Sequence, residues 1–296
     1  MKIINNIKNL KQYLATKQIK KHELEDPIGD KIRKKVLGLI HRYPDRALLL
    51  LSSACHIHCR FCFRKCQFKQ KNSFNLDKIY SYLKTNKNIT EIIFSGGDPL
   101  ALSYTFLNKI VFKLLELQNI KIWRFHTRIP VVNPQALSKD LIKLLTKISR
   151  SKQLVIVLHI NHPNEISDEM ITVIKKLQKT GALLLSQTVL LKDINDSFQV
   201  LTKLFKNLMQ IGIKPYYLHH LDQVQGTDHF RISIKDGKKI YQQLRGNLSG
   251  ICIPEYVLDL PKGLGKIPVM WLETKDNKQY LTKTFENKLA GYIDPF

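Results

Sequence analysis

Apolar residues along this chain fall into six short runs rich in leucine and β-branched side chains. Each run is continuous rather than alternating, which is typical of strands covered on both faces. Helical patterns separate them, and in residues 104–118 the apolar positions form one stripe. The other helical patterns cover about 134–148, 165–179 and 197–211, and the six runs cover 47–53, 91–96, 121–127, 154–160, 183–191 and 214–221.

The spacing of these runs indicates the fold class. Most runs begin 29 to 33 residues after the one before, which is the length of one β-α unit. We therefore expect an α/β protein whose parallel sheet curls into a partial (β/α)6-type TIM barrel over residues 41–250. Residues 1–40 are expected to form an N-terminal helical cap, and residues 251–296 to form short strands packed on the barrel mouth.

Polar residues gather at or just after the carboxyl ends of the expected strands. In a barrel of parallel strands, these ends form the face that carries the chemistry. A coincidence that extends over six strands predicts one shared site, built from Cys55, residues 95–98, residues 126–128, His159, Gln187 and residues 219–222.

Charge and hydropathy narrow the possible partners. The chain has 48 Lys and Arg against 24 Asp and Glu, a net charge of +24, but these residues are spread along the sequence without a basic block or an RNA-binding signature. A composition rich in lysine, isoleucine and asparagine gives the same excess, so a nucleic acid is not the expected partner.

No apolar run approaches the roughly 20 residues that span a membrane. Lysines interrupt the first 20 residues, unlike a signal peptide, and a cytoplasmic protein is expected.

Three of the five cysteines, Cys55, Cys59 and Cys62, lie within eight positions after the first expected strand. Such crowding in a cytoplasmic chain indicates a metal or redox centre rather than disulfides. Three thiolates leave one iron of a [4Fe–4S] cluster open to chelate a small molecule. Zinc is the alternative, but a structural zinc site usually has four protein ligands. Cys66 falls outside the triplet spacing, and Cys252 lies in an apolar run that indicates core.

The triplet, with Phe61 directly before its third cysteine, resembles the radical S-adenosylmethionine superfamily. The resemblance implies a partial (β/α) barrel and an open iron that binds the amino and carboxylate groups of the methionine part. After the second strand comes a stretch that resembles the superfamily's loop for the methionine amino group, with Asp where Glu is commoner. Its residues are Ser95, Gly96, Gly97 and Asp98.

Further stretches resemble the lysine 2,3-aminomutase family over about residues 41–268, namely HRYPDRALLL, PVVNPQ, HINHPNEIS, QTVLLKDIND and HLDQVQGTDHFR. That family also carries pyridoxal phosphate. Its cofactor lysine falls on Lys266, where this chain has KGLGK in place of GGGGK, and a lysine on a glycine-rich turn suits a Schiff base. The family's phosphate-binding residues fall on Arg42, Tyr43 and Arg46, and two guanidinium groups with a phenol suit a dianionic phosphate.

The resemblance also assigns substrate-binding residues. The arginine that binds the substrate carboxylate falls on Arg64, and the two aspartates that bind the far amino group of lysine fall on Asp222 and Asp259. Two carboxylates around one ammonium would reject shorter amino acids. His159 and Gln187 match positions near the bound S-adenosylmethionine, and residues 126–128 match a family motif to which no role is assigned.

Together these matches imply an isomerase that converts α-lysine to β-lysine. The implied cofactors are a [4Fe–4S] cluster, S-adenosylmethionine and pyridoxal 5′-phosphate, with an electron donor such as flavodoxin or ferredoxin. The chain ends about 30 residues after Lys266 and has no cysteine after Cys252, which is most similar to the shorter branch that makes β-lysine for modification of elongation factor P. The alternatives are a radical enzyme that modifies tRNA or rRNA, and a non-enzymatic iron–sulfur or zinc module.

Overall fold

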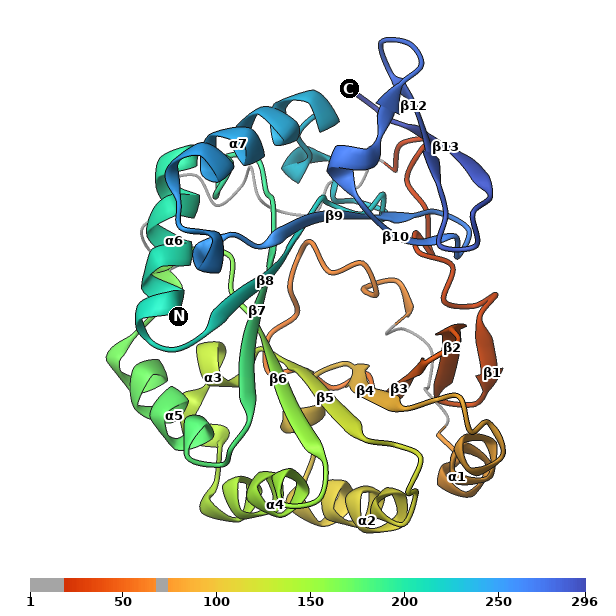
Figure 1. Ribbon diagram of the computed structural model, residues 1–296, viewed down its shortest axis with the longest axis vertical. Coiled ribbons are helices and arrows are strands. Elements are labelled where there is room, and N and C mark those ends of the chain that lie inside the picture. Colours follow the sequence, from red (N-terminus) through yellow and green to blue (C-terminus); the bar gives the residue numbers. More distant parts are fainter. Residues whose placement is uncertain (1–18, 68–73) are drawn as a thin grey trace.

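The computed structural model describes residues 19–67 and 74–296. A ten-stranded sheet runs in spatial order from β1 to β10 and curls into an open arc (Figure 1). Strands β3 to β9 are parallel, whereas β1, β2 and β10 pair antiparallel at the two edges. The strands are β1 Lys34–Val36, β2 Leu39–Tyr43, β3 Arg46–Ser52, β4 Glu91–Gly96, β5 Ile122–Thr127, β6 Gln153–His159, β7 Leu183–Val189, β8 Lys214–His219, β9 Glu255–Leu260 and β10 Gly265–Pro268.

Helices cover the outer side of the arc (Figure 1). They are α1 Leu76–Thr85, α2 Tyr104–Leu115, α3 Ile129–Val132, α4 Lys139–Ser149, α5 Asp168–Gln178, α6 Phe198–Gln210 and α7 Ile234–Asn247. A serine hydroxyl caps five of them by accepting a hydrogen bond from a backbone N–H of the first turn, and each such cap is worth about 1 kcal/mol. Within the described ranges, no helix is long and apolar enough to cross a bilayer.

The parallel barrel predicted from the sequence is confirmed. Strands β3 to β8 lie on the six apolar runs, and α2, α4, α5 and α6 lie on the four helical patterns. Strand β9 extends the parallel series by one, since it pairs with β8 through Tyr217 and Glu255. The expected C-terminal segment, residues 251–296, is thus divided between two sheets. Its last part forms a separate three-stranded sheet of β11 Glu273–Thr274, β12 Gln279–Lys283 and β13 Leu289–Ile293.

The expected helical cap over residues 1–40 is wrong where it can be compared. Residues 1–18 lie outside the described residues, and residues 19–40 contain turns and the strands β1 and β2 but no α-helix. Pro27 interrupts the segment, and Gly29 and Gly38 have φ angles of 71° and 87°, which a right-handed helix excludes. A Cβ on Gly29 would lie 2.2 Å from the backbone nitrogen of Gly263, so this segment packs backbone to backbone on the β9–β10 turn.

The inner face of the sheet lines a cavity instead of being fully packed. In β5, Trp123 and Phe125 are fully buried beneath the helices, and the Phe125 ring stacks on Phe94 at 4.3 Å between centroids. The alternating residues Arg124 and His126 point inward and line the cavity. Polar residues in these nearly continuous apolar strands therefore mark the inner face.

Candidate active site

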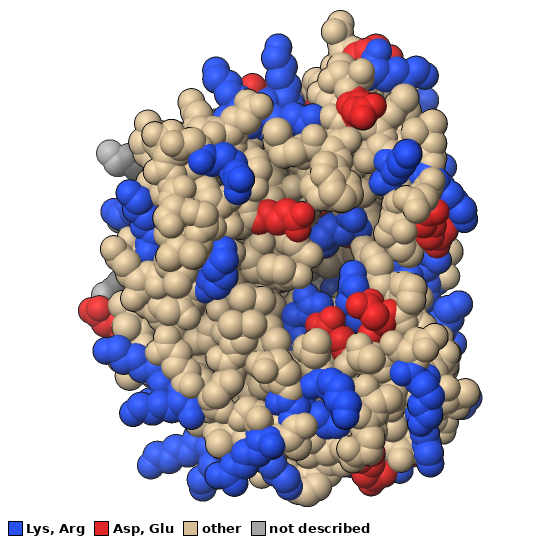
Figure 2. Space-filling model, in the orientation of Figure 1, with Lys and Arg blue, Asp and Glu red and all other residues tan. Residues whose placement is uncertain are grey.

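A cavity of about 810 Å³ lies at the carboxyl ends of the parallel strands. In Figure 2 it is a hollow near the centre of the face shown, bordered by basic and acidic side chains, while other Lys and Arg residues are spread over the surface. The structure brings every site residue predicted from the sequence to its wall: Arg42, Tyr43, Arg46, Cys55, Cys59, Cys62, Arg64, Ser95, Gly96, Gly97, Asp98, His159, Gln187, Asp222, Asp259 and Lys266. Their individual roles remain predictions.

The three clustered cysteines are free thiols on the loop that follows β3. Burial raises the pKa of Cys55 to about 12, with further contributions from Asp98 and the other two cysteines. Burial likewise raises the pKa of Cys62 to about 11. Cys55 and Cys62 therefore keep their protons unless a positive centre stabilises the thiolates.

The donor set fits an iron–sulfur cluster, although the sulfurs are not arranged around a common point. Across residues 19–67 and 74–296, no three His, Cys, Asp or Glu side chains form a group that could hold a metal ion. Cys59 Sγ instead accepts a hydrogen bond from Arg128 Nη1 at 2.7 Å. Three half-buried thiols that line one cavity are a chemically suitable ligand set, and ligation would draw the sulfurs together and release their protons.

Glycines after β4 allow the cysteine loop to lie directly on the strand. A Cβ on Gly97 would lie 2.2 Å from the Ala54 oxygen, and Gly96 has a φ of 103°. The Gly97 backbone N–H donates to Ser52 O at 2.6 Å, and the Asp98 N–H donates to Ala54 O at 2.8 Å. The close approach at these glycines is made by the chain's own backbone, immediately before Cys55.

The Asp98 carboxylate is occupied by hydrogen bonds within the protein. Its Oδ1 accepts from the Leu100 N–H at 3.0 Å and the Thr127 hydroxyl at 2.7 Å, and its Oδ2 accepts from the backbone N–H groups of Arg128 and Ile129 at 2.6 and 3.2 Å. The side chain thus joins the end of β4 to the end of β5. Contact with a methionine amino group remains a prediction for Asp98, whereas this structural role is observed.

His159 is neutral in this cavity. Burial and the neighbouring Arg128 lower the pKa of His159 to about 3, and its Nε2 lies 3.1 Å from Asn161 Oδ1. Its ring packs against Phe61 of the cysteine loop at 5.5 Å between centroids. Gln187 stands beside it on the neighbouring strand β7.

Lys266 projects into the cavity from β10. Its ammonium forms an ion pair with Asp259 on the paired strand β9 and lies 3.3 Å from His219 Nδ1. The Lys266 backbone N–H donates to the Tyr43 hydroxyl at 2.7 Å. Gly265, the last glycine of the turn, has a φ of 96° and no room for a side chain against Tyr43 and Phe285.

Two arginines beside Lys266 offer donors for a phosphate. Arg42 donates through Nη2 to Ile28 O at 2.8 Å, and its Nη1 lies 3.6 Å from Asp259. Arg42 Nε is buried without a hydrogen-bond partner among the described residues. Arg46 lies over the Tyr43 ring at 3.9 Å. An orphaned guanidinium N–H next to the candidate Schiff-base lysine fits the phosphate end of pyridoxal phosphate.

The three residues predicted to bind substrate also lie together. Burial and the nearby charge of Asp259 raise the pKa of Asp222 to about 7. Arg64 is buried, and it donates to the Ser95 hydroxyl at 3.3 Å. These residues place anion-binding and cation-binding groups in the one cavity.

Two residues of this site, Asp30 and Glu165, were not predicted from the sequence, whereas His219 and Arg128 were predicted to belong to the site but without a role. Asp30 accepts hydrogen bonds from both Arg42 and Arg64, and His219 contacts Lys266. Arg128, in a motif left without a role, links Cys59 to Glu165, whose Oε2 lies 3.1 Å from Arg128 Nη2. The residues around Asp30 and Glu165 in the sequence do not indicate these contacts, because their partners are distant along the chain.

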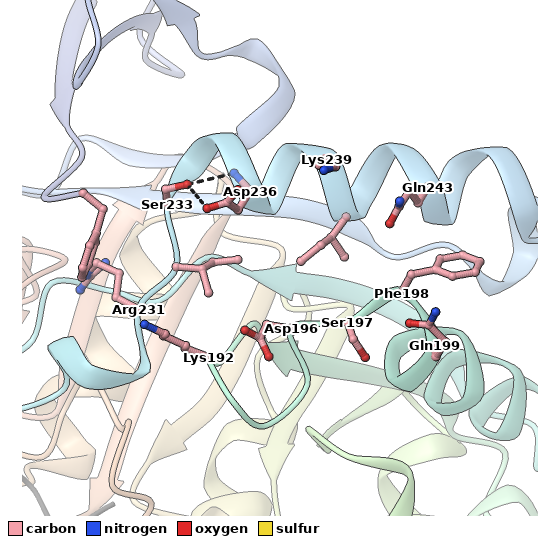
Figure 3. A pocket seen from close by; sticks show the side chains of 13 residues that line it. Lys192, Asp196, Ser197, Phe198, Gln199, Arg231, Ser233, Asp236, Lys239 and Gln243 are labelled. Atoms are coloured by element: carbon pink, nitrogen blue, oxygen red, sulfur yellow. Dashed lines mark hydrogen bonds between the residues drawn. The ribbon is translucent and has the colours of Figure 1, made fainter. Parts of the chain in front are cut away.

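A second cavity of about 600 Å³ lies outside the barrel mouth, between the start of α6 and one face of α7 (Figure 3). Its most buried polar side chain, Arg231, is turned toward Asp228 and the backbone oxygens of Leu221 and Asp222. Ser233 and Asp236 bond to each other. The hydrogen bonds from Arg231 therefore hold the loop that carries Asp222.

Comparison with known proteins defines the class and then the family. The Radical SAM superfamily matches residues 49–220, from β3 to just past β8. The crystal structure of Streptococcus suis SuiB bound to S-adenosylmethionine shares the fold, with a TM-score of 0.54 and 16% identity over 75% of this chain and 52% of that one. The protein is thus a radical SAM enzyme.

Two relatives narrow this class. A putative L-lysine 2,3-aminomutase of Aquifex aeolicus is 37% identical over 90% of this chain and 73% of its own length. The L-lysine 2,3-aminomutase of Methanococcus maripaludis is 35% identical over 98% of this chain and 70% of its own length. The chain belongs to the lysine 2,3-aminomutase family of isomerases, a family that implies a [4Fe–4S] cluster, S-adenosylmethionine and pyridoxal phosphate.

Proposed function

We propose that this protein is an L-lysine 2,3-aminomutase that moves the α-amino group of lysine to its β-carbon. The observation that carries the proposal is the position of Lys266 in the same cavity as the cysteine triplet, within reach of phosphate donors and of two aspartates. When bound, the cluster and S-adenosylmethionine supply a radical that abstracts hydrogen, and pyridoxal phosphate supplies a carbonyl that holds the migrating nitrogen.

The chain's own residues provide positioning. Arg42, Tyr43 and Arg46 would hold the phosphate, and Lys266 would anchor the carbonyl carbon through Nζ. Lys266 Nζ forms an ion pair with Asp259, so it occupies the position beside Asp259 that the substrate's far ammonium would take. Bonding of Lys266 to the cofactor carbonyl would remove this partner and leave the Asp259 carboxylate for the ε-ammonium of lysine.

Selectivity for a long diamino acid follows from Asp222 and Asp259. Both carboxylates line the cavity, and burial together with the charge of Asp259 raises the pKa of Asp222. The ε-ammonium of lysine would give these carboxylates a cationic partner, which a shorter or uncharged side chain would not supply.

The physiological setting is a separate proposal. We infer a flavodoxin or ferredoxin as electron donor and elongation factor P modification as the use of the product, on the basis of the resemblance alone. The rival function, modification of tRNA or rRNA, rests on the +24 charge, and Figure 2 shows the basic residues spread over this face without a single patch.

A product assay tests the activity. Reconstituted, reduced protein with S-adenosylmethionine, pyridoxal phosphate and lysine should yield β-lysine by mass spectrometry. Borohydride should trap pyridoxal phosphate on Lys266, and Lys266→Ala should abolish both results. Lys262→Ala, an exposed lysine of the same turn, should abolish neither. Trapping without any β-lysine would contradict the proposed reaction, and no trapped adduct would favour the RNA-modifying alternative.

A further inference from the structure

One buried carboxylate joins two of the arginines of the cavity. Asp30 is 4% exposed, and its two oxygens accept from different guanidinium groups. Its Oδ1 lies 3.1 Å from Arg42 Nη2, and its Oδ2 lies 2.9 Å from Arg64 Nε. Arg42 belongs to β2 and Arg64 to the cysteine loop, so Asp30 connects the wall beside Lys266 to the loop that bears the thiols.

The segment that carries Asp30 is held firmly in place. Asp26 accepts from the Asp30 N–H at 2.9 Å and from the Lys31 N–H at 2.8 Å, which closes the turn. Gly29 packs against the backbone of Gly263, two residues before Gly265. The carboxylate of Asp30 is thus fixed relative to the turn that precedes Lys266.

Arg42 and Arg64 depend on Asp30 to different degrees. Arg42 also donates to Ile28 O and lies 3.6 Å from Asp259. Arg64 has the Ser95 hydroxyl at 3.3 Å and stacks over Phe63 at 4.4 Å, neither of which is a charged partner. Arginine stays charged at any accessible pH. Among the described residues, Asp30 is the carboxylate that forms an ion pair with Arg64.

We propose that Asp30 is a positioning residue, which orients Arg64 to receive the carboxylate of the amino-acid substrate at a fixed distance from the phosphate-binding Arg42. This inference rests on the proposed function, because it takes the roles of both arginines from it. Substrate binding would leave the Arg64 Nε bond to Asp30 in place and use the Nη edge of the guanidinium group. The substrate carboxylate would then meet a guanidinium group whose orientation is already fixed.

Asp30→Asn tests this in cluster-free protein loaded with pyridoxal phosphate. The amide keeps the volume but loses the charge and one acceptor, so Arg64 should lose its fixed orientation. The apparent Kd for lysine, followed by the absorbance change as lysine displaces Lys266, should rise about tenfold, the size expected of one charge-assisted hydrogen bond. The Kd for pyridoxal phosphate should change less than about threefold, since Arg42 keeps its other partners.

Two further variants separate positioning from damage to the fold. Asp30→Glu should recover part of the lysine affinity, because the carboxylate is restored. Asp26→Asn perturbs the same turn without touching either arginine and should leave the lysine Kd within about twofold of wild type. Equal losses of lysine and cofactor affinity with a lower melting temperature would overturn the inference, as would an unchanged lysine Kd.

These outcomes are distinct from those for the activity itself. A wild-type protein that binds pyridoxal phosphate and lysine but yields no β-lysine would refute the proposed reaction and leave the role of Asp30 to be decided by the binding data. A wild-type protein that takes up no pyridoxal phosphate would refute both.

Discussion

The acidity of Asp222 predicts how lysine binding depends on pH. Burial and the charge of Asp259 raise the pKa of Asp222 to about 7, while Lys266, Arg231 and Arg64 act in the opposite direction. A carboxyl with a raised pKa is neutral below that value and charged above it. The ε-ammonium of lysine titrates near pH 10 and stays charged throughout. Lysine should therefore bind tightly at pH values above 7 and weakly at pH values below 7.

The size of the effect follows from the titration. With a pKa of about 7, roughly nine-tenths of the Asp222 side chains are ionised at pH 8 and roughly one-tenth at pH 6. If only the ionised form binds the ammonium, KM for lysine should rise about tenfold between pH 8 and pH 6. Initial rates of β-lysine formation at several pH values, with saturating cofactors, measure this directly.

Asp222→Asn provides the control for that experiment. An amide does not titrate, so the variant should have a high KM that is flat from pH 6 to 8. The cofactor phosphate titrates in the same range, and the variant retains it. A wild-type KM that is constant over this range would refute the reasoning, and so would a variant whose KM keeps the full slope.

Two further substitutions probe the cysteine loop. Arg128→Met removes the cation that donates to Cys59 Sγ, and hydrogen bonds to cluster sulfurs stabilise the reduced state, so the midpoint potential of the reconstituted cluster should become more negative in an EPR-monitored titration. Arg128→Lys should restore part of the shift, and an unchanged potential in Arg128→Met would show that the contact does not persist in the loaded protein. Gly97→Ala places a Cβ 2.2 Å from Ala54 O, so iron content after reconstitution should fall severalfold. Gly246→Ala, where a Cβ meets nothing within 4 Å, should keep full iron content and gain up to about 1 kcal/mol in urea unfolding.

The barrel and most of its site could be predicted because both follow local rules. Continuous apolar runs at β-α spacing specify parallel strands, and the residues that follow each strand share one face. Cys55, Asp98 and Gln187 lie at that face for this reason, whereas Arg42 and Lys266 lie on antiparallel strands and were predicted from the family resemblance. Helix α7 escaped prediction because only Ile234, Gly237 and Leu244 are buried on it, too few for an apolar stripe.

What could not be predicted depends on contacts between distant segments. Asp30 lies 34 positions before Arg64, and nothing in the sequence around it indicates that the two meet. Residues 19–40 contain no α-helix because Gly29 and Gly38 adopt left-handed backbone angles, the former where it packs on Gly263. The resemblance predicted Gly97 in a loop for the methionine amino group, and nothing in the sequence indicated that its backbone packs against Ala54 of the cysteine loop.

The open edge of the sheet has a consequence for the stability of the whole protein. Strands β1 and β10 do not pair, and side chains cross between the two ends of the sheet where Arg42 meets Asp259 and Tyr43 meets Lys266. A small molecule bound to Arg42 and Lys266 at once would connect the two ends of the sheet, which backbone hydrogen bonds do not join. Each tenfold excess of such a molecule over its Kd adds about 1.4 kcal/mol against unfolding. The supply of pyridoxal phosphate would then affect the lifetime of the folded protein as well as its turnover rate.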